Sequence, residues 1–280
     1  MDNAVRALLA RSNRLGADPR TTNYAGGNAS AKGTATDPVT GRPAELLWVK
    51  GSGGDLGTLT EAGLAVLRLA ALRDLAGVYP GVEREDEMAA AFDYCAFGKG
   101  GAAPSIDTAM HGLVEAVHVD HLHPDAGIAF ATAADSEALT AECFGDRVAW
   151  VPWRRPGFQL GLDIAAIKRD HPAAIGVILG GHGITAWGDT SDECEAHSLE
   201  IIAAAQKFIA ERGTTRPFGE KLVQTLPETE RRARAAALAP VIRGLASTDR
   251  RQLGHYTGHP AVLEFTGSEK LSALAALGTS

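Results

Sequence analysis

Cysteine is scarce in this sequence, and its pattern excludes a disulfide framework. Cys95, Cys143 and Cys194 form an odd set without Cys-x-x-Cys spacing, which is typical of reduced thiols in a reducing compartment. The charged N-terminal segment lacks the apolar core of a signal peptide. No run approaches the roughly 20 apolar residues that a membrane span requires. We therefore expect a cytoplasmic protein with no membrane partner.

Positive charge is also in short supply. The 27 Lys and Arg residues are outnumbered by 34 Asp and Glu residues, which gives a net charge of -7. A nucleic-acid surface needs clustered Lys and Arg, so we expect no nucleic-acid partner. A small anion remains compatible with an acidic exterior, because local backbone N–H groups can bind it. Neither a Walker loop nor a GxGxxG fingerprint in its strand–helix setting occurs, which disfavours a stand-alone dehydrogenase.

The apolar patterns that are present predict one α/β domain over residues 1–215. Helical spacing over 2–15, with Asp2 as its N-cap, precedes a buried strand at 46–50. A helix is expected from Thr60 to about Ala76. Strands then alternate with helices from 104 to 187, and a long helix ends near Arg212.

Residues 216–280 read as a C-terminal helical extension. The segment begins with a charged, Ala-rich helix that Pro240 interrupts. A strand is expected at 261–265, followed by a helix with Leu271, Leu274 and Leu277 on one face. These apolar faces need a covering partner, because an isolated strand and helix form no core of their own.

Three histidines form the strongest candidate site. His121 and His123 stand at i and i+2 on an expected strand, so both imidazoles project to the same face. Alone, such a pair is more often two surface histidines beside a turn. His182, between two apolar strands in Gly-Gly-His-Gly, adds a third position. Three ligands with an open fourth position are typical of catalytic zinc. His118 has the opposite strand parity and should face away.

Two Gly-rich segments and one polar cluster are candidate anion sites. Residues 26–33 and 50–58 offer backbone N–H groups beside Asn, Ser, Thr and Lys, although simple flexible turns explain either segment equally well. Ser105 stands at an expected helix start, where it caps the helix or helps to bind an anion.

Together these motifs resemble the class II aldolase/adducin family over residues 1–215. Gly-Gly-Asn-Ala-Ser resembles the family's phosphate loop with Asn28 at the key position, and Lys-Gly-Ser-Gly-Gly resembles the second phosphate turn with Ser52 and Gly53. Pro-Ser-Ile-Asp resembles the segment that carries a phosphate-binding Ser, here Ser105, and the acid/base, here Asp107. The metal-binding segments of the family are matched by those that contain His121, His123 and His182.

Two departures from the family pattern affect the chemistry. Asp107 replaces the family's Glu and is one methylene shorter, so it serves as acid/base only if its backbone lies closer to the metal. Ile106 replaces a second phosphate-binding Ser, which shifts phosphate binding towards Lys50 or backbone amides.

The resemblance implies a three-layer α/β/α fold with a central mixed, mainly antiparallel sheet. It also implies a zinc-dependent aldolase that cleaves a ketose 1-phosphate of the rhamnulose type into dihydroxyacetone phosphate and an aldehyde such as lactaldehyde. A homotetramer is expected. A metal-dependent epimerase or dehydratase, or an adducin-like binding module without catalysis, remains an alternative.

The residues around these motifs, such as His-Val-Asp-His-Leu-His-Pro-Asp-Ala, resemble the aldolase half of bifunctional proteins that continue into a short-chain dehydrogenase. Residues 216–280 are then expected to begin a linker.

Overall fold

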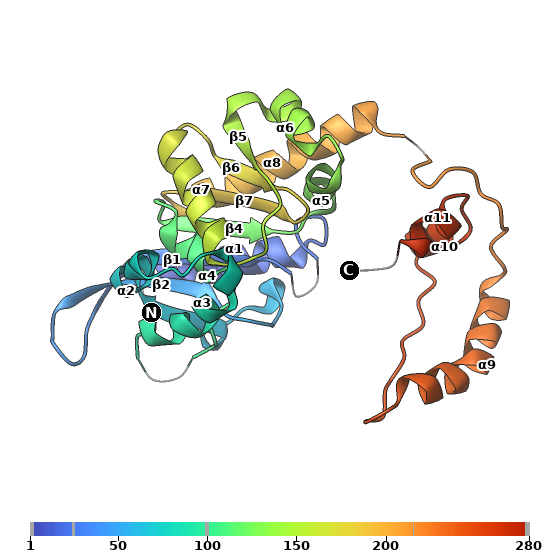
Figure 1. Cartoon of the computed structure of the whole chain (residues 1–280), viewed down its shortest axis with the longest axis horizontal. Coiled ribbons are helices and arrows are strands. Elements are labelled where there is room, and N and C mark those ends of the chain that lie inside the picture. The colour runs from blue at the N-terminus through green and yellow to red at the C-terminus, as the bar shows by residue number, and fades with distance from the viewer. Residues whose placement is uncertain (1–2, 24–25, 99–100, 215, 278–280) are drawn as a thin grey trace. The chain divides into compact units, whose positions relative to one another are not determined.

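The computed structural model describes residues 3–23, 26–98, 101–214 and 216–277 (Figure 1). The chain divides into two compact units, Met1–Glu211 and Arg212–Ser280. The N-terminal helix α1 (Asn3–Ala17) forms as its apolar spacing predicts, whereas its proposed cap Asp2 lies outside the described residues.

A seven-stranded sheet organises the first unit. Its order is β3-β2-β1-β4-β7-β6-β5, and every neighbouring pair is antiparallel except β5 and β6. The strands are β1 (Asn28–Thr36), β2 (Pro43–Lys50), β3 (Leu64–Arg68), β4 (His118–Leu122), β5 (Val148–Val151), β6 (Gly176–Leu179) and β7 (Gly183–Gly188). The predicted mixed, mainly antiparallel sheet is therefore confirmed.

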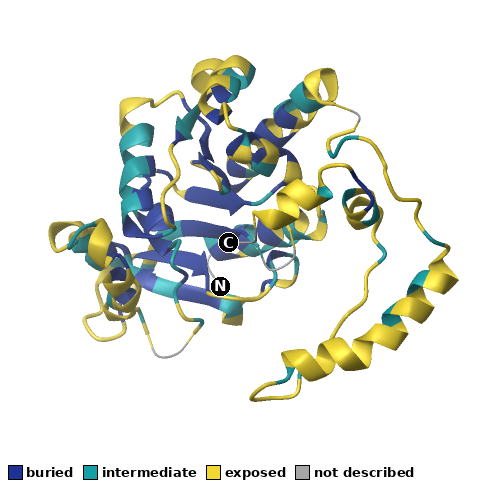
Figure 2. Cartoon of the chain, turned by 45° about the vertical axis from the view of Figure 1, so that its right-hand side comes forward, coloured by how far each residue is buried: buried dark blue, intermediate teal, exposed yellow. Residues whose placement is uncertain are grey.

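Helices cover both faces of this sheet, which explains why its strands are buried on both sides (Figure 2). Successive residues of a strand point to opposite faces. In β2, Leu46 and Trp48 therefore pack on one side, and Leu47 and Val49 pack on the other. The first side carries α1, α5 (Asp125–Thr132), α6 (Ser136–Phe144) and α8 (Ser191–Arg212). The second carries α2 (Leu69–Asp74), α3 (Asp86–Ala91), α4 (Thr108–Leu113) and α7 (Phe158–Asp170).

Two sequence predictions in this unit are wrong. The helix expected over 60–76 is instead a 3-10 turn, the strand β3 and the short helix α2. Most residues at 64–72 are apolar, so the local pattern does not distinguish the 3.6-residue period of a helix from the two-residue period of a strand. Residues 64–68 form a strand because they pair with β2. The Gly-rich segment at 26–33 is not a turn beyond Gly27, because Asn28 begins β1 between β2 and β4.

The described residues of the second unit form the helices α9 (Glu228–Ala246), α10 (Pro260–Thr266) and α11 (Leu271–Ala276). Pro240 lies inside α9 without ending it. The strand predicted at 261–265 is wrong, because this segment is α10. Pro260 occupies the first helical turn, where its fixed φ suits a helix, and the His259 side chain accepts a hydrogen bond from the Ala261 N–H. None of the helices in the described part of the chain is long and apolar enough to cross a membrane.

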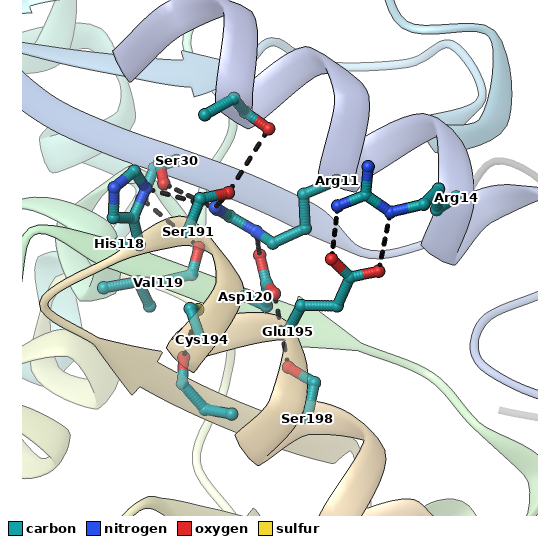
Figure 3. A network of polar contacts seen from close by, with 12 residues as sticks. Arg11, Arg14, Ser30, His118, Val119, Asp120, Ser191, Cys194, Glu195 and Ser198 are labelled. Atoms are coloured by element: carbon teal, nitrogen blue, oxygen red, sulfur yellow. Dashed lines mark hydrogen bonds and ion pairs between the residues drawn. The ribbon is translucent and has the colours of Figure 1, made fainter. Parts of the chain in front are cut away.

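A fully buried ion pair fixes the central strand β4 (Figure 3). Arg11 Nε lies 3.0 Å from Asp120 Oδ1, and both side chains have 0% exposure. The other partners of the pair come from β1, from α8 and from β4 itself. Arg11 contacts Ser191 Oγ (2.7 Å), His118 Nδ1 (3.1 Å) and the Ser30 carbonyl (3.0 Å), and Asp120 accepts from Ser198 Oγ at 3.2 Å. The network therefore joins α1, β1, β4 and α8.

His118 follows the parity argument and faces Arg11 on the same side of β4 as Asp120. Burial and the neighbouring Arg11 guanidinium lower the pKa of His118 to about 4. The neutral ring accepts a hydrogen bond from Arg11 through Nδ1, so His118 supports the buried network.

Breaking this pair should be costly. Asp120→Asn keeps the side-chain size but leaves the Arg11 guanidinium buried without a counter-charge, and we expect the free energy of unfolding to fall by about 3–5 kcal/mol. Urea denaturation measures the change without the screening that a salt denaturant introduces. The matched control is Glu200→Gln in the exposed pair between Arg147 and Glu200, where we expect about 1 kcal/mol or less. Equal losses in both variants would contradict a special role for the buried pair.

Candidate metal centre

His121 lies on β4 and is fully buried. Its Nδ1 atom is 2.9 Å from the carbonyl oxygen of Ile184 on the neighbouring strand β7. Because a carbonyl only accepts hydrogen bonds, the ring proton resides on Nδ1. The lone pair of Nε2 is therefore available to a ligand, which is how a hydrogen bond at one imidazole nitrogen prepares the other for a metal.

His123 and His182 complete a three-imidazole cluster. His123 follows the end of β4, and His182 precedes β7 in the turn after β6. The Nε2 atoms of His121 and His123 are 2.9 Å apart, and ring centroids within the cluster are separated by 4.6–5.0 Å. One nitrogen from each ring lies within 4.8 Å of the others. The structure thus brings together the three histidines that the sequence predicts.

The donor set fits a divalent metal ion. Burial lowers the pKa of all three imidazoles: His123 to about 4, His121 well below its ordinary value, and His182 in the same direction, although Asp107 opposes the shift there. All three rings are therefore neutral at neutral pH, which is the form that binds metals. His182 Nδ1 is also buried without a hydrogen-bond partner among the described residues. Neutral imidazoles suit zinc and several other first-row metals.

Asp107 lies beside this cluster, at the N-cap position of α4. Burial raises the pKa of its carboxyl, while the neighbouring His182 ring, hydrogen bonds from Ser105 and Asn28 and the charge of Lys50 oppose the rise. Oδ2 accepts the Ser105 hydroxyl at 3.3 Å, whereas Oδ1 is buried with no partner among the described residues. A buried carboxyl oxygen beside a candidate metal site can accept a proton from a bound substrate.

Asn28 and Ser105 lie next to Asp107. Asn28 pairs with His121 in the β1–β4 ladder, and its Nδ2 atom donates to Ser105 Oγ at 3.3 Å. Asp107 is the residue at the N-cap position and makes no side-chain cap hydrogen bond, whereas the predicted cap Ser105 accepts the Asp107 N–H through Oγ at 3.2 Å.

Lys50 ends β2 and is 2% exposed. Its charge acts on Asp107 and His123, and burial lowers its own pKa. Ser52 and Gly53 follow in an exposed turn, where Gly53 has a φ of 74° that favours glycine. The Ser52 N–H donates to the Ala103 carbonyl at 2.8 Å, so this amide is not free for an anion.

The contact between Thr185 and His121 was not predicted from the sequence. Thr185 Oγ1 lies 3.4 Å from His121 Nδ1 and donates to Met110 Sδ at 3.6 Å. A buried Thr in an apolar strand carries no local signal for this role, which follows from the β4–β7 register alone.

Comparisons with known proteins agree with this fold. Residues 7–209 match the sequence profile described as the Class II Aldolase and Adducin N-terminal domain. An uncharacterized oxidoreductase, YuxG, from Bacillus subtilis (strain 168) is 36% identical over 277 residues, which are 99% of this chain and 40% of that protein. The chain thus spans less than half the length of this relative.

Solved structures share the architecture. The N-terminal class II aldolase domain of a conserved protein from Thermoplasma acidophilum has a TM-score of 0.66 and 27% identity, covering 75% of this chain and 95% of that one. An L-fuculose 1-phosphate aldolase has a TM-score of 0.52 and 16% identity, covering 85% and 97%, and this likeness shows the fold alone. With the profile match across most of the first unit, these findings establish that the chain belongs to the class II aldolase and adducin family.

Proposed function

We propose that the protein is a zinc-dependent aldolase that cleaves a ketose 1-phosphate of the rhamnulose type into dihydroxyacetone phosphate and an aldehyde such as lactaldehyde. The observation that carries this proposal is the proximity of three neutral imidazoles to a buried carboxyl oxygen without a partner among the described residues. The similar fold of an L-fuculose 1-phosphate aldolase supports the reaction type by analogy.

His121, His123 and His182 would hold the zinc ion. When bound, the ion would polarise the ketose carbonyl as a Lewis acid, and three neutral ligands would leave it its full double positive charge. Of the chain's own residues, the Ile184 carbonyl orients His121, and the β4–β7 pairing places this ring beside His182. Three protein ligands leave a coordination position open for substrate.

Asp107 would move the proton. Its Oδ1 would accept the proton of the hydroxyl on the carbon that becomes the aldehyde. This carbon is the one on the far side of the scissile carbon–carbon bond from the ketose carbonyl. As that bond breaks, the C–O group becomes the aldehyde carbonyl and the bonding electron pair passes to the ketose fragment as an enediolate. Return of this proton from Asp107 to the enediolate carbon that carried the broken bond gives dihydroxyacetone phosphate. Burial, which raises the pKa of Asp107, brings its carboxyl closer to the basicity this transfer requires.

The phosphate group would lie near Asn28, Ser52 and Gly53, with Lys50 as a further cation and Ser105 as the contact that the family resemblance implies. Lys50 supports this placement because it is a buried ammonium close to Asp107 and His123. A homotetramer remains part of the proposal.

A metal-dependent epimerase is the second candidate, and the exchange of Glu for Asp107 favours it, because a shorter base changes which substrate atom it reaches. A panel of ketose 1-phosphates, coupled to detection of dihydroxyacetone phosphate, separates the two. An aldolase releases the triose phosphate, whereas an epimerase changes the sugar's configuration and releases none. The oxidoreductase name of the Bacillus relative belongs to a much longer protein, and we assign no hydride transfer to residues 1–280.

Removing one ligand should remove the metal. We expect purified protein to contain about one zinc ion per chain, and His123→Ala to lose both the metal and the cleavage activity, because two remaining imidazoles bind weakly. Elemental analysis after dialysis measures the metal content. His171→Ala, at an exposed position, is the control and should keep both. Full zinc occupancy in the His123 variant would show that the metal is bound elsewhere.

Removing the proton acceptor should leave the metal in place. Asp107→Asn preserves size, and we expect kcat to fall by about 10²- to 10⁴-fold with unchanged zinc content, the usual range for general acid–base catalysis. Steady-state cleavage kinetics provide the measurement, with the exposed Asp146→Asn as the control. If Asp107→Asn cleaves substrate at the wild-type rate, the base is another residue.

A further inference from the structure

Asp107 stands at the start of a helix that is too short to hold its own position. Helix α4 has six residues, Thr108–Leu113, and one of them is Gly112. Isolated helices shorter than about 12 residues are marginal in water, and a glycine inside a helix weakens it further. The location of the Asp107 carboxyl therefore depends on the contacts that hold α4 in the folded molecule.

Apolar packing keeps α4 close to α7 and α2. A side chain at Gly161 of α7 would collide with Ala109, and a side chain at Gly112 would collide with Leu72 of α2. Hydrophobic attraction has no direction of its own, whereas a hydrogen bond requires a defined distance and angle. Polar contacts between α4 and the sheet therefore add the positional precision that apolar packing lacks.

Strand β1 provides such a contact in the middle of α4. Ser30 points to the same face of the sheet as Asn28, because residues two apart in a strand share a face. Ser30 Oγ lies 2.8 Å from Nδ1 of His111. Both residues have 0% exposure, so this hydrogen bond is shielded from a substrate at the histidine cluster.

Lys32, the next residue on this face of β1, binds the chain just beyond the end of α4. Its Nζ atom donates to the carbonyls of Val114 at 2.7 Å and Ala116 at 2.5 Å, and its backbone N–H donates to the Val117 carbonyl at 2.8 Å. The last carbonyls of a helix have no partner within the helix, and a lysine side chain can satisfy them. Lys32 thus holds the connection between α4 and β4, the strand that carries His121.

Strand β1 is also the strand that fixes His121. Asn28 pairs with His121 in the β1–β4 ladder, two residues before Ser30 and four before Lys32. One strand therefore sets both the position of a candidate metal ligand and the position of the helix that begins after Asp107.

We infer that Lys32 is a positioning residue, which together with Ser30 fixes α4 on β1 and so sets the distance between Asp107 and the histidine cluster. The inference rests on the proposed aldolase function. It also gives the short side chain of Asp107 a means of reaching the substrate, because contacts at the far end of α4 hold the backbone of Asp107 near the metal ligands.

The test replaces Lys32 with methionine, which has a similar length but no donor. Burial and the charge of Arg73 lower the pKa of Lys32 to about 7, so a charged side chain is costly here and its removal should leave the protein folded. We expect kcat to fall by about 10- to 100-fold, because a displacement of about 1 Å can reduce a rate by about 100-fold. KM should change much less, since the proposed phosphate contacts on β1 and after β2 do not move with α4.

Four further variants separate positioning from a loss of structure. Lys168→Met is the matched control and should keep the wild-type kcat, because Lys168 also donates to a backbone carbonyl, that of Pro172 at 3.3 Å, but at the end of α7. Lys32→Arg retains donors and should restore most of the rate. Ser30→Ala removes the contact with His111 and should lower kcat in the same direction, which provides the test if Lys32→Met does not fold. In an Asp107→Asn background, Lys32→Met should lower kcat no further, as a double-mutant cycle requires for residues that act together.

Three readouts do not depend on activity. Elemental analysis of Lys32→Met should find the wild-type zinc content. A crystal structure of this variant should show Asp107 displaced relative to His121 and His182, with the histidines in their wild-type positions. Hydrogen exchange should be faster at the N–H of Val114, which donates to the Met110 carbonyl at 3.4 Å, and unchanged in β4.

The inference is overturned by a wild-type kcat in Lys32→Met, by an equal rate loss in the Asp107→Asn background, or by an Asp107 that keeps its place in the variant structure. A rate loss that Lys168→Met shares would contradict it as well. Failure of the proposed function looks different, because wild-type protein would then cleave no ketose 1-phosphate. The crystal structure and the hydrogen exchange would still decide whether Lys32 positions Asp107.

Discussion

The buried contact between Arg11 and Asp120 is the interaction on which the candidate site depends. It fixes β4, which carries His121, from the opposite side of the sheet. Successive residues of β4 point to opposite faces of the sheet. His118 and Asp120 therefore face the Arg11 network, whereas His121 faces α4 and its strand neighbour β7. A strand anchored by a satisfied polar network on one face can present an unsatisfied cluster on the other.

That unsatisfied cluster is costly for the fold. A buried polar atom without a partner costs about 1–3 kcal/mol, and Asn28 Oδ1, Asp107 Oδ1 and His182 Nδ1 are such atoms among the described residues. They come from β1, the start of α4 and the turn before β7, yet hydrogen bonds and charge interactions link them around one point. Native structures keep such groups where a ligand satisfies them. These three atoms gather at the candidate site, whereas Ser12, Thr108, His111 and Arg231 carry further unpartnered buried atoms among the described residues.

Family membership fixes less than the site does. Class II aldolase-like folds serve several reactions, so the reaction must be argued from the particular side chains present. Here those are three neutral imidazoles, a short carboxylate and a serine that donates to this carboxylate. Asp107 and Ile106 depart from the family pattern at neighbouring positions, immediately before α4 and beside the histidine cluster.

The sequence by itself determined several helices and strands of the first unit. Apolar periodicity predicts the helices α1 and α8 and the strands β2, β4, β6 and β7. It also identified the three histidines, because i and i+2 positions of a strand share a face whatever the surroundings. Local pattern failed where neighbours decide. β3 is a strand because β2 lies beside it, and α10 is a helix although its residues alternate like a strand.

Only the tertiary structure decided how the site is assembled. The pairing of Asn28 with His121 and the hydrogen bond from Asn28 to Ser105 depend on contacts between residues far apart in the chain. So do the neutral state of the histidines and the raised pKa of Asp107, because burial is a property of the folded molecule and not of any segment. The sequence supplies the chemical groups, whereas packing in the folded molecule determines their protonation states and the orientation of their side chains.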